Sequence, residues 1–136
     1  MTREQIEGLS GWELDGEIAE WVTHIGHVIR PPYGTGRLVY GPSSNPLYST
    51  GPLDVPHYST TWEGMALVVT RLTAMVGDDG DHLRVTLDIG SMGTLVTVGN
   101  PNDHPIHWHK CVVEGPPETA APTAVARVAL LVVAEE

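Results

Sequence analysis

Phenylalanine is absent from this chain of 136 residues, and cysteine occurs only once, at Cys111. The single cysteine excludes an internal disulfide and fits a reducing cytosol. Without phenylalanine, Val, Leu, Ile, Trp and Met must fill the core. A chain of this length favours one domain, and such a domain buries roughly two-thirds of its unfolded surface without needing a disulfide or a metal.

Positive charge is also scarce, since 7 Lys and Arg residues face 17 Asp and Glu residues and the net charge is −10. This balance argues against binding to nucleic acid, which needs a surplus of basic side chains to neutralise phosphates. Arg30 and Arg37 flank the turn "PPYGTG" and are candidates for contacting a small anionic ligand. The alternative for both is an ordinary place on the surface. "YGTGR" lacks the Gly-Lys-Ser/Thr end of a phosphate-binding loop.

The sequence contains no apolar run long enough for a membrane span, and "MTREQIEGLS" at its start contains no apolar signal region. We therefore expect neither a membrane protein nor an exported one.

Helical periodicity predicts two amphipathic helices, over residues 11–23 and 61–76. Thr2 with Gln5 and Ser10 with Glu13 have the spacing of capping boxes near the start of the chain. Gly77 has the position and residue type of a helix C′ residue.

Alternating apolar and polar residues predict strands in "HLRVTLDIG" and "TLVTV", which the turn "GSMG" joins into a hairpin. "PIHWHKCVV" indicates a further strand, and "HVIRPP" and "GRLVYG" indicate two short ones. Residues 41–57 are rich in Pro, Gly and Ser and predict a long loop, which is typical of a functional or mobile segment.

The C-terminal segment is apolar nearly all round, so periodicity does not separate a buried strand from a helix there. Pro122 suits the first turn of a helix, with Thr119 near its cap, and such a helix must be buried. The order of elements predicts one domain over residues 1–136, of the α+β class. We expect an αβα sandwich, in which helices cover a mainly antiparallel sheet.

Three segments, "LDGEIAEWV", "VPHYSTTWEGMALVVTRL" and "GPPETAAPTAVARVALLVV", together resemble the phage ABA sandwich domain family of small phage and prophage proteins. The matching positions are Leu14, Asp15, Ile18, Ala19, Trp21, Pro56, Tyr58, Ser59, Thr60, Trp62, Pro122, Ala126, Arg127, Ala129, Leu130 and Leu131. The resemblance covers nearly the whole chain in matching order.

The resemblance implies a helix–sheet–helix sandwich, a phage origin and a place in the cytoplasm of the infected host. It implies no catalytic mechanism, because the family is largely of unknown function. Thr61 stands where the family usually has an Asp after Tyr-Ser-Thr, so no role of that carboxylate carries over. The histidine-rich strand is not part of the family pattern.

The first candidate site is the run that opens the second helix, with His57, Tyr58, Ser59, Thr60 and Trp62. One interpretation is structural: Ser59 or Thr60 caps the helix, Thr60 and Glu63 form a capping box, and Trp62 anchors the helix. The other is functional, because a helix N-terminus with hydroxyls and aromatic rings can hold a phosphate or a base. The run is then a site only if Tyr58 and His57 face an open pocket.

The second candidate is "NDHPIHWHKC", where a strand would place His107, His109 and Cys111 on one face. His104, His107 and His109 are plausible zinc ligands, and Asp103 could complete the set. The alternative is the polar outer face of an edge strand, since no His-Glu-x-x-His or Cys-x-x-Cys motif is present. Nothing indicates the depressed thiol pKa that a catalytic Cys111–His pair requires.

No catalytic triad or metalloprotease motif occurs, which favours a protein that is not an enzyme. We expect it to bind a small polar ligand in the host cytosol, and a nucleotide-type signal of antiviral defence is one hypothesis. A structural or partner-binding protein is the first alternative, and a zinc-dependent hydrolase built on His104, His107 and His109 is the second. A sandwich this small favours a homo-oligomer.

Overall fold

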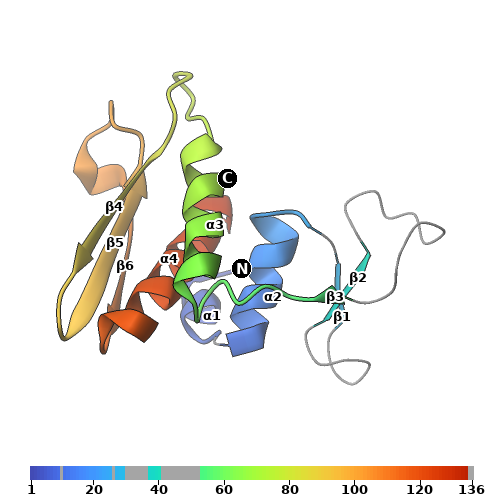
Figure 1. Cartoon of the computed structure of the whole chain (residues 1–136). Coiled ribbons are helices and arrows are strands. Elements are labelled where there is room, and N and C mark those ends of the chain that lie inside the picture. The colour runs from blue at the N-terminus through green and yellow to red at the C-terminus, as the bar shows by residue number, and fades with distance from the viewer. Residues whose placement is uncertain (10, 26, 30–36, 41–52, 135–136) are drawn as a thin grey trace.

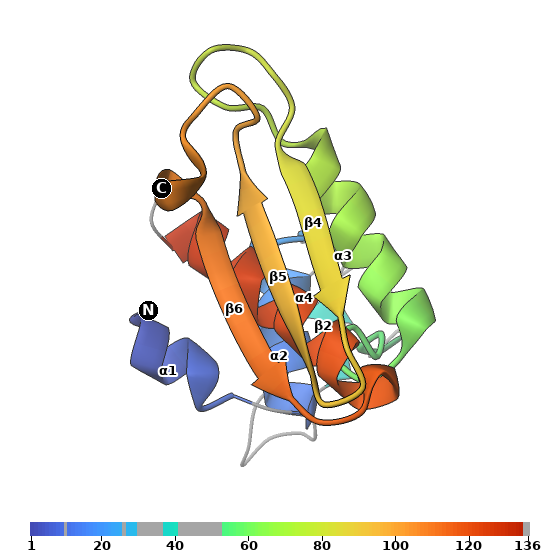
Figure 2. The same ribbon diagram turned by 90° about the vertical axis from the view of Figure 1, so that its left-hand side faces the viewer.

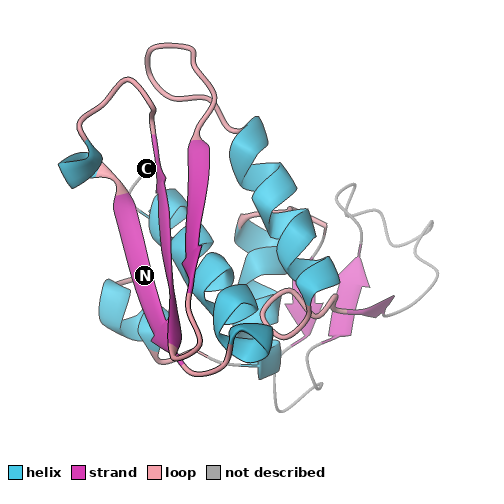
Figure 3. Ribbon diagram, turned by 60° about the vertical axis from the view of Figure 1, so that its left-hand side comes forward, coloured by secondary structure: helices cyan, strands magenta, loops and turns pink. Residues whose placement is uncertain are grey.

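The computed structural model describes residues 1–9, 11–25, 27–29, 37–40 and 53–134 (Figure 1). Their elements are α1 (Arg3–Glu7), α2 (Gly11–Trp21), β1 (His27–Ile29), β2 (Arg37–Tyr40), β3 (Leu53–Asp54), α3 (Trp62–Ala74), β4 (Arg84–Ile89), β5 (Gly93–Gly99), the 3-10 helix η2 (Pro105–His107), β6 (His109–Glu114) and α4 (Pro117–Ala134). Figure 3 colours the helices cyan and the strands magenta, and the presence of both confirms the α+β class.

The strands form two antiparallel sheets, β4-β5-β6 and the smaller β1-β2-β3. The predicted hairpin of β4 and β5 is confirmed, and β6 pairs with the other edge of β5. The predicted loop over residues 41–57 ends earlier than expected, because β3 pairs with β2 within that range. Residues 41–52 lie outside the described part of the chain.

Helix α4 lies at the centre of the fold, between the β4-β5-β6 sheet and helix α2, with α3 beside it (Figure 1). Its Ala, Val and Leu side chains are buried nearly all round, as an apolar helix requires. Its length and composition would allow a membrane span, but 61% of it is buried inside the fold, which is typical of a core helix. Pro122 was wrongly expected in the first turn, because the helix begins at Pro117 and continues through Pro122.

Helices α3 and α4 cover one face of the β4-β5-β6 sheet, and Figure 2 looks onto the other face, which no described helix covers. The layer order is therefore sheet, then α3 with α4, then α2, with α1 packed on α4 beside the β6 edge (Figure 2), and it differs from the αβα order that we predicted. The alternation along the strands explains the difference. Arg84, Thr86, Asp88, Lys110 and Glu114 point outward and are exposed, and a covering helix would bury these charges.

The caps of the helices agree only in part with the sequence patterns. The Thr2–Gln5 capping box of α1 is confirmed, whereas Ser10 lies outside the described residues. Helix α3 ends at the C-cap Met75 with an extended backbone, and Gly77 was wrongly predicted as a left-handed C′ residue. The reason is that Met75 already belongs to the next pairing, since its carbonyl accepts a hydrogen bond from the Leu83 N–H at 2.9 Å.

Candidate functional site

The segment before α3 turns Tyr58 into the core. Tyr58 is 2% exposed, and its hydroxyl lies 3.0 Å from the Thr23 hydroxyl at the end of α2. Burial raises the pKa of Tyr58, and the Thr23 hydrogen bond opposes this shift. The phenol is therefore a neutral, hydrogen-bonded part of the core, and it does not reach a ligand at the surface.

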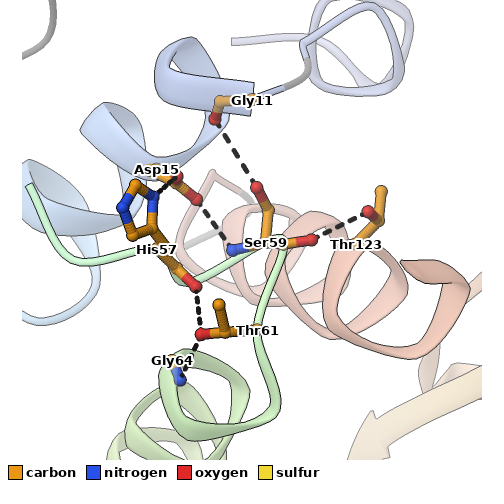
Figure 4. A network of polar contacts seen from close by, with 7 residues as sticks. All are labelled: Gly11, Asp15, His57, Ser59, Thr61, Gly64 and Thr123. Carbon is orange, nitrogen blue, oxygen red and sulfur yellow. Dashed lines mark hydrogen bonds and ion pairs between the residues drawn. The ribbon is translucent and has the colours of Figure 1, made fainter. Parts of the chain in front are cut away.

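Ser59 is the centre of a polar network that joins three helices (Figure 4). Its backbone N–H donates to Asp15 Oδ1 at 2.7 Å, its hydroxyl donates to the Gly11 carbonyl at 3.5 Å, and its carbonyl accepts from the Thr123 hydroxyl at 3.0 Å. Asp15, Ser59 and Thr123 thus connect α2, the segment before α3, and α4. Each polar group of Ser59 is used to hold the fold together.

Asp15 is a buried carboxylate within this network, with 2% of its surface exposed. Burial raises its pKa, while the hydrogen bonds from Ser59 and the nearby His57 lower it in part. His57 Nδ1 lies 4.0 Å from Asp15 Oδ2, and the imidazole side chain is 74% exposed.

The N-cap of α3 is Thr61, and not Ser59 or Thr60 as the spacing suggested. The Thr61 hydroxyl accepts from the Gly64 N–H at 3.0 Å and donates to the His57 carbonyl at 2.8 Å. A Cβ atom on Gly64 would lie 2.1 Å from that carbonyl oxygen, so the close approach requires glycine. Thr60 belongs to the turn of residues 58–60, and Thr61 separates it from the first residue of the helix.

The other predicted members of the first site are dispersed. Thr60 is exposed, and Trp62 is 46% exposed, so Trp62 does not anchor α3 in the core as predicted. Arg30 lies outside the described residues, and of Arg37 the structure describes the backbone in β2 only. The run opening α3 is a structural junction, and of its predicted ligand contacts His57, Thr60 and Trp62 have exposed side chains.

The second candidate segment has a different local structure from the continuous strand that we predicted. Pro105–His107 forms the 3-10 helix η2, with Pro105 at its start, and β6 begins at His109. His104 caps η2, since its Nδ1 accepts from the Ile106 N–H at 3.1 Å. His107 therefore does not share a strand face with His109.

Asp103 holds His107 in place. The His107 Nδ1 lies 2.9 Å from Asp103 Oδ1, which also accepts from the His104 N–H at 2.8 Å. These two contacts hold the pKa of the Asp103 carboxyl below its usual value, and the contact with His107 has the larger effect. A carboxylate that accepts from Nδ1–H fixes the ring and leaves its Nε2 available.

Trp108 fixes the turn between η2 and β6 against the end of β5. Its indole N–H donates to the Asn100 carbonyl at 3.0 Å. A Cβ on Gly99 would fall 2.3 Å from Trp108 Cγ, so the ring lies directly on this glycine. The position of His107 depends on this contact, because His107 immediately precedes Trp108.

A pocket of about 210 Å³ lies where β5 ends and β6 begins, next to the last turn of α4. We call it the histidine pocket, and it is lined by Leu83, Val98, Gly99, Asn100, His107, His109 and Val132. Its apolar walls come from three separate segments of the chain, and two imidazoles are among its lining residues. These residues lie at or near the start of β4, the end of β5, the start of β6 and the last turn of α4, whereas the first candidate site lies at the N-terminal end of α3.

The structure brings together His107 and His109 of the predicted zinc ligands, while His104 does not line the pocket. The rings of His104 and His107 have their centroids 6.5 Å apart. Within the described residues, no three His, Cys, Asp or Glu side chains gather closely enough to hold a metal ion. The zinc site remains a prediction.

Cys111 lies on the opposite side of β6 from the one suggested by the outer-face interpretation. It is 4% exposed and faces the helices, where burial raises the pKa of its thiol. Val112, which follows Cys111 and so lies on the other face of β6, is 65% exposed. The alternation of residues between the two faces of β6 was predicted correctly, but the outer-face interpretation assigned the face of Cys111 to the solvent. The small cysteine side chain packs on α4 more easily than lysine or glutamate would.

The sequence patterns missed the apolar walls of the histidine pocket. Leu83, Val98 and Val132 come from three separate segments of the chain, and nothing local marks them as neighbours. The pairing of Asp103 with His107 did carry a signal, since the residues are four positions apart across Pro105, a spacing that one turn brings together.

Comparison with family models, curated proteins and solved structures finds no significant match. The resemblance to the phage ABA sandwich domain family therefore remains a prediction from the sequence motifs.

Proposed function

We propose that this protein is a binding protein without enzymatic activity, and that a small polar ligand binds in the histidine pocket. The observation that supports this most is the orientation of His107 by Asp103 at a hollow with apolar walls. Small-molecule sites typically combine such walls with a few placed polar groups.

The chemistry of the pocket limits what it accepts. Asp103 is ionised at neutral pH, as an aspartate ordinarily is, and its carboxylate accepts the Nδ1–H of His107, which lowers the pKa of Asp103 further. The Nε2 of a neutral His107 ring then accepts a hydrogen bond from a ligand N–H or O–H. Leu83, Val98 and Val132 offer an apolar surface to a flat ring.

The volume of about 210 Å³ is smaller than that of pockets for whole drug-sized molecules, which begin near 300 Å³. The pocket therefore accepts one ring or one head group. For a nucleotide-type signal, we propose that the base enters the pocket and the phosphates stay outside. The loops that follow α3 and β5 carry the exposed carboxylates of Asp79, Asp81 and Asp103. These carboxylates repel phosphates, so the phosphates would extend away from the two loops.

The biological part of the proposal rests on the sequence resemblance. A phage protein in the host cytoplasm that captures such a signal would keep antiviral defence silent. This part is tested separately, by expressing the protein in bacteria that carry a nucleotide-signalled defence and measuring phage plating with the wild-type chain and with a pocket variant.

The binding experiment uses titration calorimetry and thermal shift with nucleosides, mononucleotides, cyclic dinucleotides and ADP-ribose. We expect saturable binding that weakens roughly tenfold or more in His107→Ala, the loss of one good polar contact. His57→Ala is the matched control, since it removes an exposed imidazole of the first candidate site. Binding that is lost in His57→Ala and kept in His107→Ala would move the site to the α3 junction. Absence of binding by every compound would remove the nucleotide hypothesis.

A partner-binding function is the second candidate, and a separate apolar hollow favours it. This hollow of about 240 Å³ is lined by Met1, Trp21, Leu130, Val133 and Ala134. Trp21 is 54% exposed there, and exposed tryptophans are typical anchors of protein interfaces. A stoichiometric host protein that cross-links to the wild-type chain and is lost in Trp21→Ser would support this candidate.

The zinc-hydrolase alternative is tested by elemental analysis after dialysis against zinc. Bound zinc that disappears in both His107→Ala and His109→Ala would support it, and a protein without zinc would exclude it.

A further inference from the structure

The outer face of the β4-β5-β6 sheet is ordered in rows by the strand register. Thr86, Thr97 and Lys110 form one row, and Asp88, Leu95 and Val112 form the next. These side chains point away from α3 and α4, because Val96, Val98 and Cys111 of the opposite parity are buried. No described helix covers this face (Figure 2).

The charges on this face separate along the strands. Arg84 and Lys110 lie towards the end where β4 and β6 begin, and Asp88 and Glu114 lie towards the end where these strands finish. Apolar groups accompany both halves, and of these Trp108 is half-buried while Val112 and Met92 are exposed. Trp108 lies over Gly99 at the basic end, Val112 is 65% exposed in the middle, and Met92 is 83% exposed in the turn at the acidic end.

We propose that this face binds a second copy of the same chain. The two faces pack against each other around a two-fold axis that lies in the interface and runs perpendicular to the strands. This rotation brings the basic end of each copy onto the acidic end of the other. In that arrangement Lys110 meets Glu114 and Arg84 meets Asp88 across the interface, within one row of each other. The interface is isologous and closes as a dimer.

The apolar side chains match in the same arrangement. The axis carries Trp108 of one copy towards Val112 and Glu114 of the other, so its ring covers an exposed valine. Two sheets pack face to face about 10 Å apart, a distance that long Arg, Lys and Trp side chains span. The other arrangement, with the axis along the strands, would place the two basic ends together, with Lys110 near Arg84, and the two acidic ends together, with Asp88 near Glu114, and is disfavoured.

The size of the face predicts a weak dimer. Strands about 4.8 Å apart and rows about 6.8 Å apart give a patch of roughly 14 by 20 Å. This is smaller than the ~800 Å² per partner of a standard interface. We therefore expect association in the micromolar to millimolar range, independent of any ligand in the histidine pocket.

Sedimentation equilibrium of the full chain over a micromolar-to-millimolar series tests the proposal. We expect a monomer–dimer equilibrium whose dissociation constant rises roughly tenfold or more in Lys110→Glu and in Glu114→Lys, since each places like charges opposite each other. The double variant, with both substitutions, restores opposite charges across the interface and should return close to the wild-type constant.

The two single variants control for each other, because they change the net charge in opposite directions. An effect of net charge alone would weaken one dimer and strengthen the other. Thermal unfolding confirms that each variant folds. A wild-type chain that stays monomeric throughout the series, single variants with opposite effects, or a double variant without recovery would overturn the proposal.

Discussion

The carboxylate of Asp15 accepts a 2.7 Å hydrogen bond from the backbone N–H of Ser59, 44 residues further along the chain. Both residues are almost fully buried, Asp15 at 2% and Ser59 at 1% exposure. The contact fixes the segment before α3 to the side of α2 (Figure 4). A buried charge is tolerated here because backbone and side-chain groups compensate part of its lost hydration.

Removing the Asp15 carboxylate should destabilise the protein. Asp15→Ala leaves the buried Ser59 N–H without its acceptor, so we expect a loss of about 1–3 kcal/mol in the free energy of unfolding. Asp15→Asn keeps an oxygen at the same place and should lose less. Urea unfolding measures both, with Glu13→Ala as the control, since Glu13 is exposed on the same helix. Equal losses in Asp15→Ala and Glu13→Ala would contradict the role assigned to the contact.

The same carboxylate makes a signed contribution to the pH dependence of stability. Its pKa in the folded protein is raised, mainly by burial, above the ordinary aspartate value of 3.8. The folded state therefore favours the protonated form. The stabilising contribution of the Asp15 carboxyl group is fully present below the pKa that this group has in the unfolded chain. It is lost as the pH rises through the raised pKa of the folded protein.

Asp15→Asn cannot titrate, so it isolates this contribution. Its stability relative to wild type should rise as the pH increases from below 3.8 through the raised pKa, and then level off. Urea unfolding of both proteins over this pH series gives the difference, in which the other carboxyl groups cancel. A difference that does not change with pH, or that falls, would contradict the assignment.

The elements of the fold were predictable where local periodicity determines them. The apolar stripe of α2, the β4–β5 hairpin and the capping box of Thr2 depend on residues within one or two turns of each other. The amphipathic pattern of α3 also placed that helix within two residues at each end.

The remaining features depend on partners distant in sequence. Tyr58 looked like a candidate contact because the sequence could not reveal Thr23 as its partner. Thr61 caps α3 because the His57 carbonyl offers a second partner to its hydroxyl, which spacing alone does not show. The histidine pocket needs Val132 from α4, more than twenty residues from His109, and only the packed fold brings them together.

The contact between Gly64 and the His57 carbonyl predicts an unusually costly glycine substitution. Gly64→Ala would place a Cβ 2.1 Å from a backbone oxygen, which has no flexible end to move. We expect a loss of about 1–3 kcal/mol from overpacking, although alanine is the better helix former. Gly8→Ala is the control, since its nearest contact would be an ordinary 3.5 Å. Thermal unfolding should show a lower melting temperature for Gly64→Ala alone, and an unchanged value would contradict the contact.

Thr94 offers a substitution that should stabilise the protein. Its side chain faces the helices from β5, is 1% exposed, and its hydroxyl has no hydrogen-bond partner among the described residues. Thr94→Val has nearly the same shape and removes the buried hydroxyl, whose unmet hydrogen bonds cost about 1–3 kcal/mol. We expect the free energy of unfolding to rise by about 1 kcal/mol, the lower end of that range.

Thr97→Val on the same strand is the control, because Thr97 points to the opposite face and is half-buried. Its hydroxyl reaches water there, so its substitution should change stability by a few tenths of a kcal/mol, about ±0.5. Urea unfolding at low micromolar concentration separates these effects from association through the outer sheet face. A destabilised Thr94→Val would mean that the hydroxyl has a partner in solution and would contradict the prediction.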